Sequence, residues 1–190
     1  MKPIKHKIIA DTPWLKLVEA EVEIRGVVKK WTYCTRRENL DTTPTTPDAV
    51  VIVPFAREGG ETRLILVREY RIPLNQTIIA LPAGLVDAGE TVETSARREL
   101  LEETGYAVVS ILDKSPPTLF SSAGLTDETF QFVFVEAEHC GAPQLEASEE
   151  IEVLSVTLEE LKTLLDGHPV ICGRTWPLCY QYLQNHKFPI

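Results

Sequence analysis

The chain has 190 residues, of which 44% are hydrophobic and 25% charged, a composition typical of one soluble globular domain. The 28 Asp and Glu residues outnumber the 19 Lys and Arg residues, so the formal net charge is −9. This acidic balance argues against binding to a nucleic-acid backbone, which needs a basic surface. We expect no nucleic-acid partner, and we expect a cation to mediate binding if the substrate is anionic.

The N-terminal segment MKPIKHKIIADTPW contains only a short apolar patch, Ile8 to Ala10, and lacks the apolar core of a signal peptide. No apolar run approaches the roughly 18 residues of a membrane span. These features predict a cytoplasmic protein without a membrane partner. The cysteines show no C-x-x-C spacing, and we expect all of them to be buried thiols: Cys34, Cys140, Cys172 and Cys179.

The first part of the chain has the pattern of a β-hairpin. Residues 14–36 alternate apolar and polar side chains around Arg25-Gly26, which predicts an antiparallel pair of strands. The polar segment RENLDTTPTTPD follows and is typical of a linker. We therefore expect a small β arm over residues 1–48 and a main domain over residues 49–190. A two-stranded arm must pack either on its own core or on another subunit.

The main domain alternates strand and helix signals. Apolar runs predict strands at 49–55, 63–69, 77–81, 130–135 and 151–156, with Gly59-Gly60 as a hairpin turn between the first two. Apolar stripes predict helices at 158–165 and 177–183. Another helix is predicted at 92–104, because Thr91 can cap its N-terminus and Gly105 its C-terminus. This order of elements predicts an α+β fold or an α/β/α sandwich with a mixed sheet.

Three glutamates crowd one turn of that helix. At about 100° per residue, Glu99, Glu102 and Glu103 fall within roughly 100° of arc, so their carboxylates point the same way. Leu100 and Leu101 point elsewhere and are expected to pack against the sheet. Like charges at helical spacing repel, so the cluster is either an acidic solvent-facing stripe or a site for a divalent cation. Clustered carboxylates suit hard cations, Mg²⁺ first and Mn²⁺ next.

The spacing around these glutamates favours the second interpretation. Residues 84–106 match the Nudix box pattern G-x5-E-x7-R-E-U-x-E-E-x-G-U, in which only Tyr106 departs from the preferred bulky aliphatic residue. A chance match is on the order of 10⁻⁸ to 10⁻⁹ per starting position. The chain therefore resembles the Nudix hydrolases, which implies the Nudix α/β/α sandwich with a mixed sheet and a small N-terminal antiparallel β arm. The matching residues are Gly84, Glu90, Arg98, Glu99, Leu100, Glu102, Glu103 and Gly105.

The resemblance extends beyond the box. The stretches VREYRIP…IIALPAGLVDAGET and PWLKLVEAEVEI…KKWTYCTRRE are similar to ADP-ribose pyrophosphatases and related nucleoside-diphosphate-sugar hydrolases, over about residues 13 to 185. This implies Mg²⁺-dependent cleavage of ADP-ribose to AMP and ribose 5-phosphate, with Mn²⁺ able to replace Mg²⁺. ADP-glucose, UDP-glucose and GDP-mannose are alternative substrates. A catalytically silent nucleotide-sensing module is the alternative from another functional class.

The same resemblance implies roles for acidic residues and for one arginine. The main-chain carbonyl of Ala83 and the carboxylates of Glu99 and Glu103 would be metal ligands, and Glu102 would share a metal. Arg98 can pair with Glu90 and orient the turn that carries the ligands. The general base would be Glu149 in the stretch EASEEIEV, with Glu150 as the alternative.

Four further residues match substrate contacts of the family. Trp14 and Trp31 would sandwich the nucleobase from two subunits of a swapped homodimer, although ordinary packing is the alternative for each tryptophan. Arg36 and Arg71 match positions that contact phosphate or ribose. Two departures leave the sugar preference open. Many ADP-ribose enzymes have glutamate just before the PAG turn, where this chain has IIAL, and have proline where this chain has Ala123.

Overall fold

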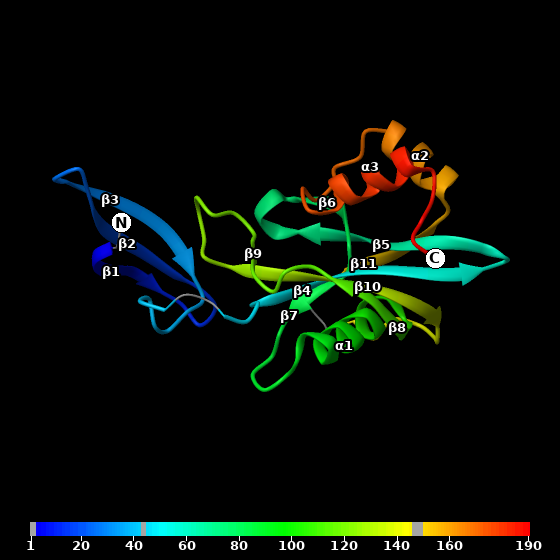
Figure 1. Ribbon diagram of the computed structural model, residues 1–190, viewed down its shortest axis with the longest axis horizontal. Coiled ribbons are helices and arrows are strands. Elements are labelled where there is room, and N and C mark those ends of the chain that lie inside the picture. The colour runs from blue at the N-terminus through cyan, green and yellow to red at the C-terminus, as the bar shows by residue number, and fades with distance from the viewer. Residues whose placement is uncertain (1–2, 43–44, 146–149) are drawn as a thin grey trace. The chain divides into compact units, whose positions relative to one another are not determined.

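The structure of the protein is a computed structural model that describes every residue except 1–2, 43–44 and 146–149 (Figure 1). The chain forms two compact units. One comprises Met1–Ala49 together with Pro116–Phe130, and the other comprises Val50–Ser115 together with Gln131–Ile190. The grouping of the segment 116–130 with the N-terminal strands is a feature for which the sequence pattern gave no signal.

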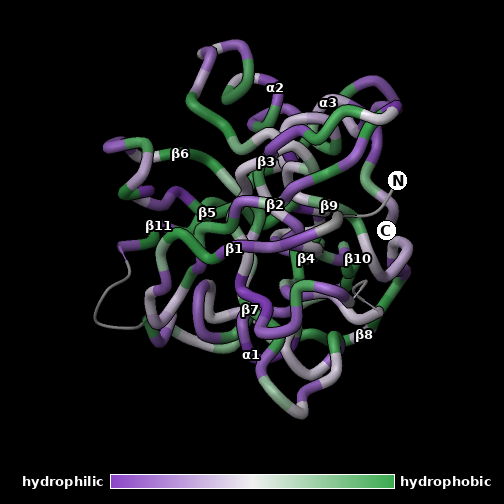
Figure 2. Tube along the Cα trace, turned by 90° about the vertical axis from the view of Figure 1, so that its left-hand side faces the viewer, coloured by the Kyte–Doolittle hydropathy of each residue, from purple (hydrophilic) through white to green (hydrophobic). Residues whose placement is uncertain are grey.

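The N-terminal unit is built on an antiparallel sheet in the order β1-β2-β3, formed by Pro3–Asp11, Lys16–Ile24 and Val27–Thr35. Arg25 (φ 53°) and Gly26 (φ 78°) connect β2 to β3 in the left-handed region that a two-residue hairpin turn requires. The predicted hairpin is thus confirmed. Strand β1 was not predicted, because its sequence has little apolar alternation, and Figure 2 colours it largely hydrophilic.

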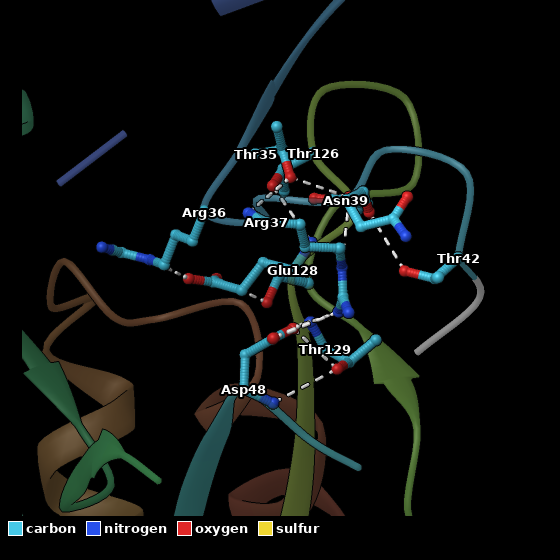
Figure 3. A network of polar contacts seen from close by, with 11 residues as sticks. Thr35, Arg36, Arg37, Asn39, Thr42, Asp48, Thr126, Glu128 and Thr129 are labelled. Atoms are coloured by element: carbon cyan, nitrogen blue, oxygen red, sulfur yellow. Dashed lines mark hydrogen bonds and ion pairs between the residues drawn. The ribbon is translucent and has the colours of Figure 1, made fainter. Parts of the chain in front are cut away.

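A polar network fixes the chain that follows β3 (Figure 3). Arg37 Nη2 donates to both carboxylate oxygens of Asp48, at 3.1 and 2.8 Å. The same carboxylate accepts from the amide and the hydroxyl of Thr129, at 2.7 and 2.8 Å. Thr35 donates to Asp127 at 2.9 Å. The two ends of the segment predicted as a linker, Arg37 and Asp48, are therefore tied to residues 127–129 of the same unit.

The second unit contains a sheet in the order β11-β5-β4-β10-β8. Strand β6 pairs with β5, and β7 pairs with β4. Gly59 and Gly60, at φ 60° and 85°, form the predicted hairpin turn between β4 and β5. All five strands predicted from apolar runs are confirmed, and β7 and β8 were missed. The strands span Ala49–Glu58 (β4), Glu61–Arg71 (β5), Gln76–Ala80 (β6), Ala83–Leu85 (β7), Tyr106–Lys114 (β8), Thr129–His139 (β10) and Ile151–Val156 (β11), and the short pieces are η1 (Ile72–Leu74) and β9 (Leu119–Phe120).

Helices cover both faces of this sheet (Figure 1). Helix α1 (Val92–Thr104) lies on one face, and α2 (Leu158–Asp166) and α3 (Thr175–Asn185) lie on the other. Thr91 caps α1 by accepting from the Thr94 amide at 3.2 Å, and Gly105 ends it at φ 73°. The three helices are confirmed, and so is the α+β fold, an α/β/α sandwich with a mixed sheet.

The core has two layers because alternate residues of β4 face opposite helices. Val50 and Ile52 belong to the buried cluster that includes Leu100 of α1. On the other face, the Phe55 ring meets the Tyr182 ring of α3 edge-on, with centroids 5.5 Å apart. Leu100 is fully buried, but Leu101 is 37% exposed, so its expected packing on the sheet was wrong: it lies one residue, and about 100°, further round the helix.

Two further sequence expectations can be compared with the structure. Of the four cysteines, only Cys179 is buried, because it faces the core from α3, whereas Cys34 and Cys172 are half-buried and Cys140 is exposed. The expectation of four buried thiols was therefore wrong. Among the described residues, no helix is both long and apolar enough to cross a membrane.

Candidate active site

The site is built where strand β7 meets helix α1. Gly84 lies in β7, and the carboxylate of Glu99 lies directly against it. A Cβ atom added at Gly84 would fall 1.9 Å from Glu99 Cδ and 2.0 Å from its Oε1. Glycine is therefore required at position 84 because the space that a side chain would take is filled by a carboxylate.

Arg98 gathers the acidic side chains of the site. Its Nη2 donates to Glu90 Oε2 at 2.9 Å, and its Nη1 donates to Glu99 Oε1 at 2.7 Å and to Glu102 Oε2 at 3.3 Å. Nη2 also donates to the backbone carbonyl of Leu85 in β7, at 3.2 Å. One guanidinium thus links the loop before α1, the turn that carries the glutamates, and the strand on which they lie. The pairing of Arg98 with Glu90 that the sequence predicted is present.

Glu90 is held as an anion. Arg98 donates to both of its oxygens, and Ser95 Oγ donates to Oε2 at 2.6 Å. Hydrogen bonds from Arg98 first and Ser95 second lower the pKa of Glu90 to about 2. The contact with Glu90 in turn raises the pKa of Arg98 above its ordinary value. The pair therefore stays charged throughout the neutral range, and Ser95 is a contributor for which the sequence gave no signal.

Glu103 lies one helical turn beyond Glu99. Its side chain is buried, at 7% exposure, and its Oε2 accepts a hydrogen bond from the Ala83 amide at 3.1 Å. Glu99 and Glu103 therefore both contact the β7 backbone at neighbouring residues, Gly84 and Ala83. Glu102 lies nearer the surface, with 45% of its side chain exposed. The structure thus places Glu99 and Glu103 against the β7 backbone and links Glu102 to Glu99 through Arg98.

The chemistry of these donors suits a hard divalent cation. Carboxylate and carbonyl oxygens are the ligands that Mg²⁺ takes in proteins, usually through a few carboxylates with substrate phosphates completing the shell. Within the part of the chain that the structure describes, no three Asp, Glu, His or Cys side chains form a group that could hold a metal ion by themselves. The protein would thus supply part of a coordination shell, and a phosphate ligand would supply more.

A cleft of about 50 Å³ opens beside Glu103. Its walls include Ala83 and Glu103 and also Glu69 and Arg71 from the end of β5. Arg71 Nη1 pairs with Glu69 at 3.1 Å and is half exposed. Arg71, predicted to contact substrate, therefore lies on the same cleft as two of the predicted metal ligands. The cleft also contains Arg174, which the sequence analysis did not single out.

The other predicted substrate residues belong to the N-terminal unit. Trp14 is 77% exposed and Trp31 is 56% exposed, so neither side chain is buried in the core of that unit. Arg36 Nη1 donates to the Trp14 carbonyl at 3.1 Å, and Arg36 Nε pairs with Glu128 at 3.4 Å (Figure 3). Trp31 Nε1 donates to the Gly124 carbonyl at 3.3 Å. Trp14 and Arg36 are thus neighbours.

Trp31 also lines a larger pocket within that unit, of about 430 Å³. Tyr33 and Phe120 add aromatic surface to it, and Asp127 adds a carboxylate. Ala123, where relatives with the SPG-like turn would have proline, is another lining residue. The pocket offers apolar faces with one acidic group, a combination that suits a planar polar ring.

The predicted general base falls at the edge of the described chain. Glu149 lies outside the described residues, so its prediction is untested. Glu150, the alternative, is exposed just before β11.

Comparison with known proteins identifies the class. The family model described as the NUDIX domain matches residues 45–171, well over half of the chain, so the chain belongs to the Nudix family of hydrolases.

Individual relatives agree with this assignment. A putative nudix hydrolase 2 from Caenorhabditis elegans is 36% identical over 181 residues, covering 90% of this chain and 79% of the relative. An ADP-ribose pyrophosphatase from Bacillus subtilis is 34% identical over 140 residues, covering 73% of this chain and 72% of the relative. A solved structure, of an ADP compounds hydrolase, superposes with a TM-score of 0.66 at 22% identity, covering 87% of this chain and 82% of that one, and shows that the fold is shared.

Proposed function

We propose that the protein hydrolyses the pyrophosphate bond of a nucleoside diphosphate sugar, with ADP-ribose as the first candidate and AMP and ribose 5-phosphate as the products. The observation that carries the proposal is the Glu99 carboxylate lying against the side-chain-free backbone of Gly84, beside Arg98. Two relatives that cover most of this chain are named ADP-ribose pyrophosphatase and ADP-sugar pyrophosphatase, which supports the substrate class. ADP-glucose, UDP-glucose and GDP-mannose are the alternative substrates.

A divalent cation is part of this proposal. The carbonyl of Ala83 and the carboxylates of Glu99 and Glu103 would hold it, Glu102 would share one, and Mg²⁺ is preferred with Mn²⁺ as a substitute. When bound, such an ion neutralises charge on the diphosphate and lowers the pKa of a coordinated water. This answers how a chain of net charge −9 could bind an anionic substrate.

Arg98 and Glu90 are assigned a positioning role. Arg98 is hydrogen-bonded to Glu99 and Glu102 on α1 and to the Leu85 carbonyl on β7. Glu90 restrains the same guanidinium from the other side. Together they fix the rotamers of the carboxylates over β7, as groups behind metal ligands commonly do.

The proton of the attacking water is assigned to a carboxylate on the chain before β11. Glu149 is the first candidate and Glu150 the second. Either could accept that proton as a general base. Glu149→Gln and Glu150→Gln, compared at saturating Mg²⁺, decide between them, because only the true base should lower kcat strongly.

Base recognition is assigned to the N-terminal unit. The exposed rings of Trp14 and Trp31 are available to stack on a nucleobase, and we propose that two subunits of a homodimer contribute them. Arg36 and Arg71 are assigned to phosphate or ribose. A cytoplasmic location, and the lack of nucleic-acid or membrane partners, stay predictions from the sequence.

One assay tests the function. The protein is incubated with Mg²⁺ and a panel of nucleoside diphosphate sugars, dinucleotides and nucleoside triphosphates, and the products are identified by mass. We expect AMP and ribose 5-phosphate from ADP-ribose, with no reaction in EDTA. In ¹⁸O-water, the labelled product shows which phosphorus is attacked. No divalent-dependent cleavage of any compound would refute the proposal and favour a silent nucleotide-sensing module, which would still bind a nucleotide.

A further inference from the structure

The cleft beside Ala83 and Glu103 contains a second arginine. Arg174 lines it together with Arg71, and the side chain of Arg174 is half-buried. This residue lies beyond residues 45–171, where the NUDIX family model matches. It is also far from the box in sequence, so its place in the cleft is a property of the folded chain.

The backbone around Arg174 is anchored to the strand that leads into the site. The Ile79 amide donates to the Val170 carbonyl at 2.8 Å, and the Cys172 amide donates back to the Ile79 carbonyl at 2.8 Å. These bonds form a parallel bridge between Ile79 of β6 and Ile171. The residues just before Arg174 are therefore fixed to the sheet rather than carried on a free loop.

A second anchor lies on the other side of Arg174. The Leu81 amide donates to Thr175 Oγ1 at 3.0 Å, and Thr175 is 1% exposed. Leu81 itself is buried, at 4% exposure. Leu81 precedes Ala83 by two residues, so this bond ties the start of α3 to the strand segment that enters β7. Arg174 is thus held between two anchors on the same stretch of chain that positions the predicted metal ligands.

The cleft is lined by both acidic and basic side chains. Two acidic residues, Glu69 and Glu103, line the cleft, and Arg71 pairs with Glu69 at 3.1 Å. Arg174 supplies a second guanidinium at the same opening. A guanidinium presents a planar fork of donors that matches two phosphate oxygens at once, and it keeps its charge at any physiological pH. Two arginines lining one cleft suit a ligand with more than one anionic oxygen, and such a ligand would compete with Glu69 and Glu103, which line the same cleft.

We propose that Arg174 binds the diphosphate of the substrate from the cleft side and, with Arg71, positions it against the carboxylates of α1. This assignment rests on the proposed function. Its role is substrate binding and positioning, so its loss should raise both KM and the Kd of substrate. Arg174 also precedes α3 as its N-cap residue, and its side chain makes no capping hydrogen bond.

The test compares three substitutions. Arg174→Gln removes the guanidinium, and Arg174→Lys keeps a charge but loses the fork. Arg57→Gln is the control, because Arg57 is an exposed arginine near the β4–β5 turn and the change in net charge is the same. Binding of a non-hydrolysable α,β-methylene analogue of ADP-ribose is measured by calorimetry with Mg²⁺, and KM and kcat are measured with ADP-ribose and Mg²⁺.

We expect Arg174→Gln to weaken binding and raise KM by about 10- to 100-fold, as loss of a charge-assisted hydrogen bond does. Arg174→Lys should recover part of this loss, and Arg57→Gln should stay within about twofold of wild type. If Arg174→Gln lowers the melting temperature, the Kd and KM of Arg174→Met are used instead, because methionine keeps the apolar stem of the arginine side chain. If the Arg174 variants all lower kcat but leave the Kd unchanged, Arg174 has a structural role and the proposal is overturned.

The two proposals fail in different ways. If the wild-type protein hydrolyses nucleoside diphosphate sugars and the Arg174 variants bind and turn them over as wild type does, only the assignment of Arg174 is refuted. If the wild-type protein shows neither divalent-dependent hydrolysis nor binding of these compounds, the proposed function is refuted, and the assignment of Arg174 falls with it.

Discussion

Gly84→Ala is the substitution that isolates the contact between β7 and α1. The new Cβ would lie 1.9 Å from Glu99 Cδ, 2.0 Å from Oε1 and 2.4 Å from Oε2. Cβ atoms essentially never approach other heavy atoms within 3.0 Å, so the carboxylate must retreat by about 1.1 Å. The obstructing atoms are the end of a flexible side chain rather than backbone. Glu99 can therefore rotate away, and the fold should survive.

The expected cost falls on activity rather than on stability. A displacement of about 1 Å at a reacting group can reduce a rate about 100-fold, which corresponds to about 2.7 kcal/mol in the activation free energy. The rotated Glu99 would also leave the 2.7 Å hydrogen bond to Arg98 Nη1. We expect kcat for ADP-ribose to fall by about 100-fold or more, with more Mg²⁺ needed for half-maximal rate, while the melting temperature changes by only a few degrees.

Two controls make the result decisive. Gly141→Ala adds the same methyl group where nothing lies within 4 Å, and it should leave kcat unchanged. Glu99→Gln and the double variant Gly84→Ala/Glu99→Gln complete a cycle, and the double variant should lose little more than Glu99→Gln alone, because both changes disable one carboxylate. Wild-type kcat and Mg²⁺ dependence in Gly84→Ala would refute the assignment of Glu99 as a ligand. Additive losses in the cycle would refute the shared mechanism.

Three further predictions concern charge and substrate contact. Arg98 holds the pKa of Glu90 at about 2 against 4.5 for a free carboxyl, so Glu90 contributes stability above pH 4.5 that is lost as the pH falls towards 2. In Glu90→Gln, the melting temperature should therefore fall less steeply with acid than in the wild type. A profile of melting temperature against pH that runs parallel to wild type would contradict this. Burial raises the pKa of Tyr106 from 10.0 to about 12, so the neutral phenol contributes stability below pH 10 that is lost as the pH rises towards 12; Tyr106→Phe should therefore weaken the alkaline loss seen by circular dichroism, and an equally steep loss would refute the cause. Trp31→Ala should raise KM for ADP-ribose by roughly 5- to 150-fold, with Trp176→Ala as the unaffected control, because Trp176 on α3 is 46% exposed against 56% for Trp31; an effect on dimerisation alone would assign Trp31 to packing.

The elements that the sequence predicted are those with local signals. Helix α1 runs over Val92–Thr104 as predicted, because Thr91 and Gly105 mark its ends by their own capping chemistry. The two hairpins follow in the same way from Gly26 and Gly60, whose backbones adopt positive φ angles. Each of these signals is contained within a few residues, so no knowledge of the tertiary fold was needed.

The missed strands depend on partners that are distant in sequence. Strand β7 has only three residues, and its pairing with β4 defines it as a strand. Strand β8 buries only Tyr106 and Val108, although it begins with an apolar run, YAVVSIL, of the kind that predicted the other strands. In the N-terminal unit, β1 is recognised by its pairing with β2. Hydrogen bonds to partners outside the strand, rather than a pattern of side chains, define β1 and β7 as strands.

The residues of the candidate site also differ in whether a local sequence pattern could predict them. Helical periodicity alone predicted that Glu99, Glu102 and Glu103 share a face, and the box pattern indicated that Gly84 belongs with them. Arg174 could not be found in this way, because it reaches the cleft through the bridge between Ile79 and Ile171, and no spacing in the sequence encodes that bridge. Residues on one helix can be predicted from period; residues that meet through the sheet require the fold.

Repulsion among the glutamates suggested at first that a cation must offset it, but the structure shows that the chain supplies part of the compensation itself. Arg98 donates hydrogen bonds to Glu90, Glu99 and Glu102, so a single guanidinium stabilises this turn of α1. We infer that α1 folds without a bound ion and that the ion enters a site already held in shape. If Glu99 is a metal ligand, as proposed, a divalent cation would share it with Arg98, and the strength of that competition would set how much metal the enzyme needs. Arg98 stays protonated, and its positive charge is partly balanced by the carboxylates that it contacts. The affinity of the site for a divalent cation should therefore depend on Arg98 as much as on the glutamates themselves.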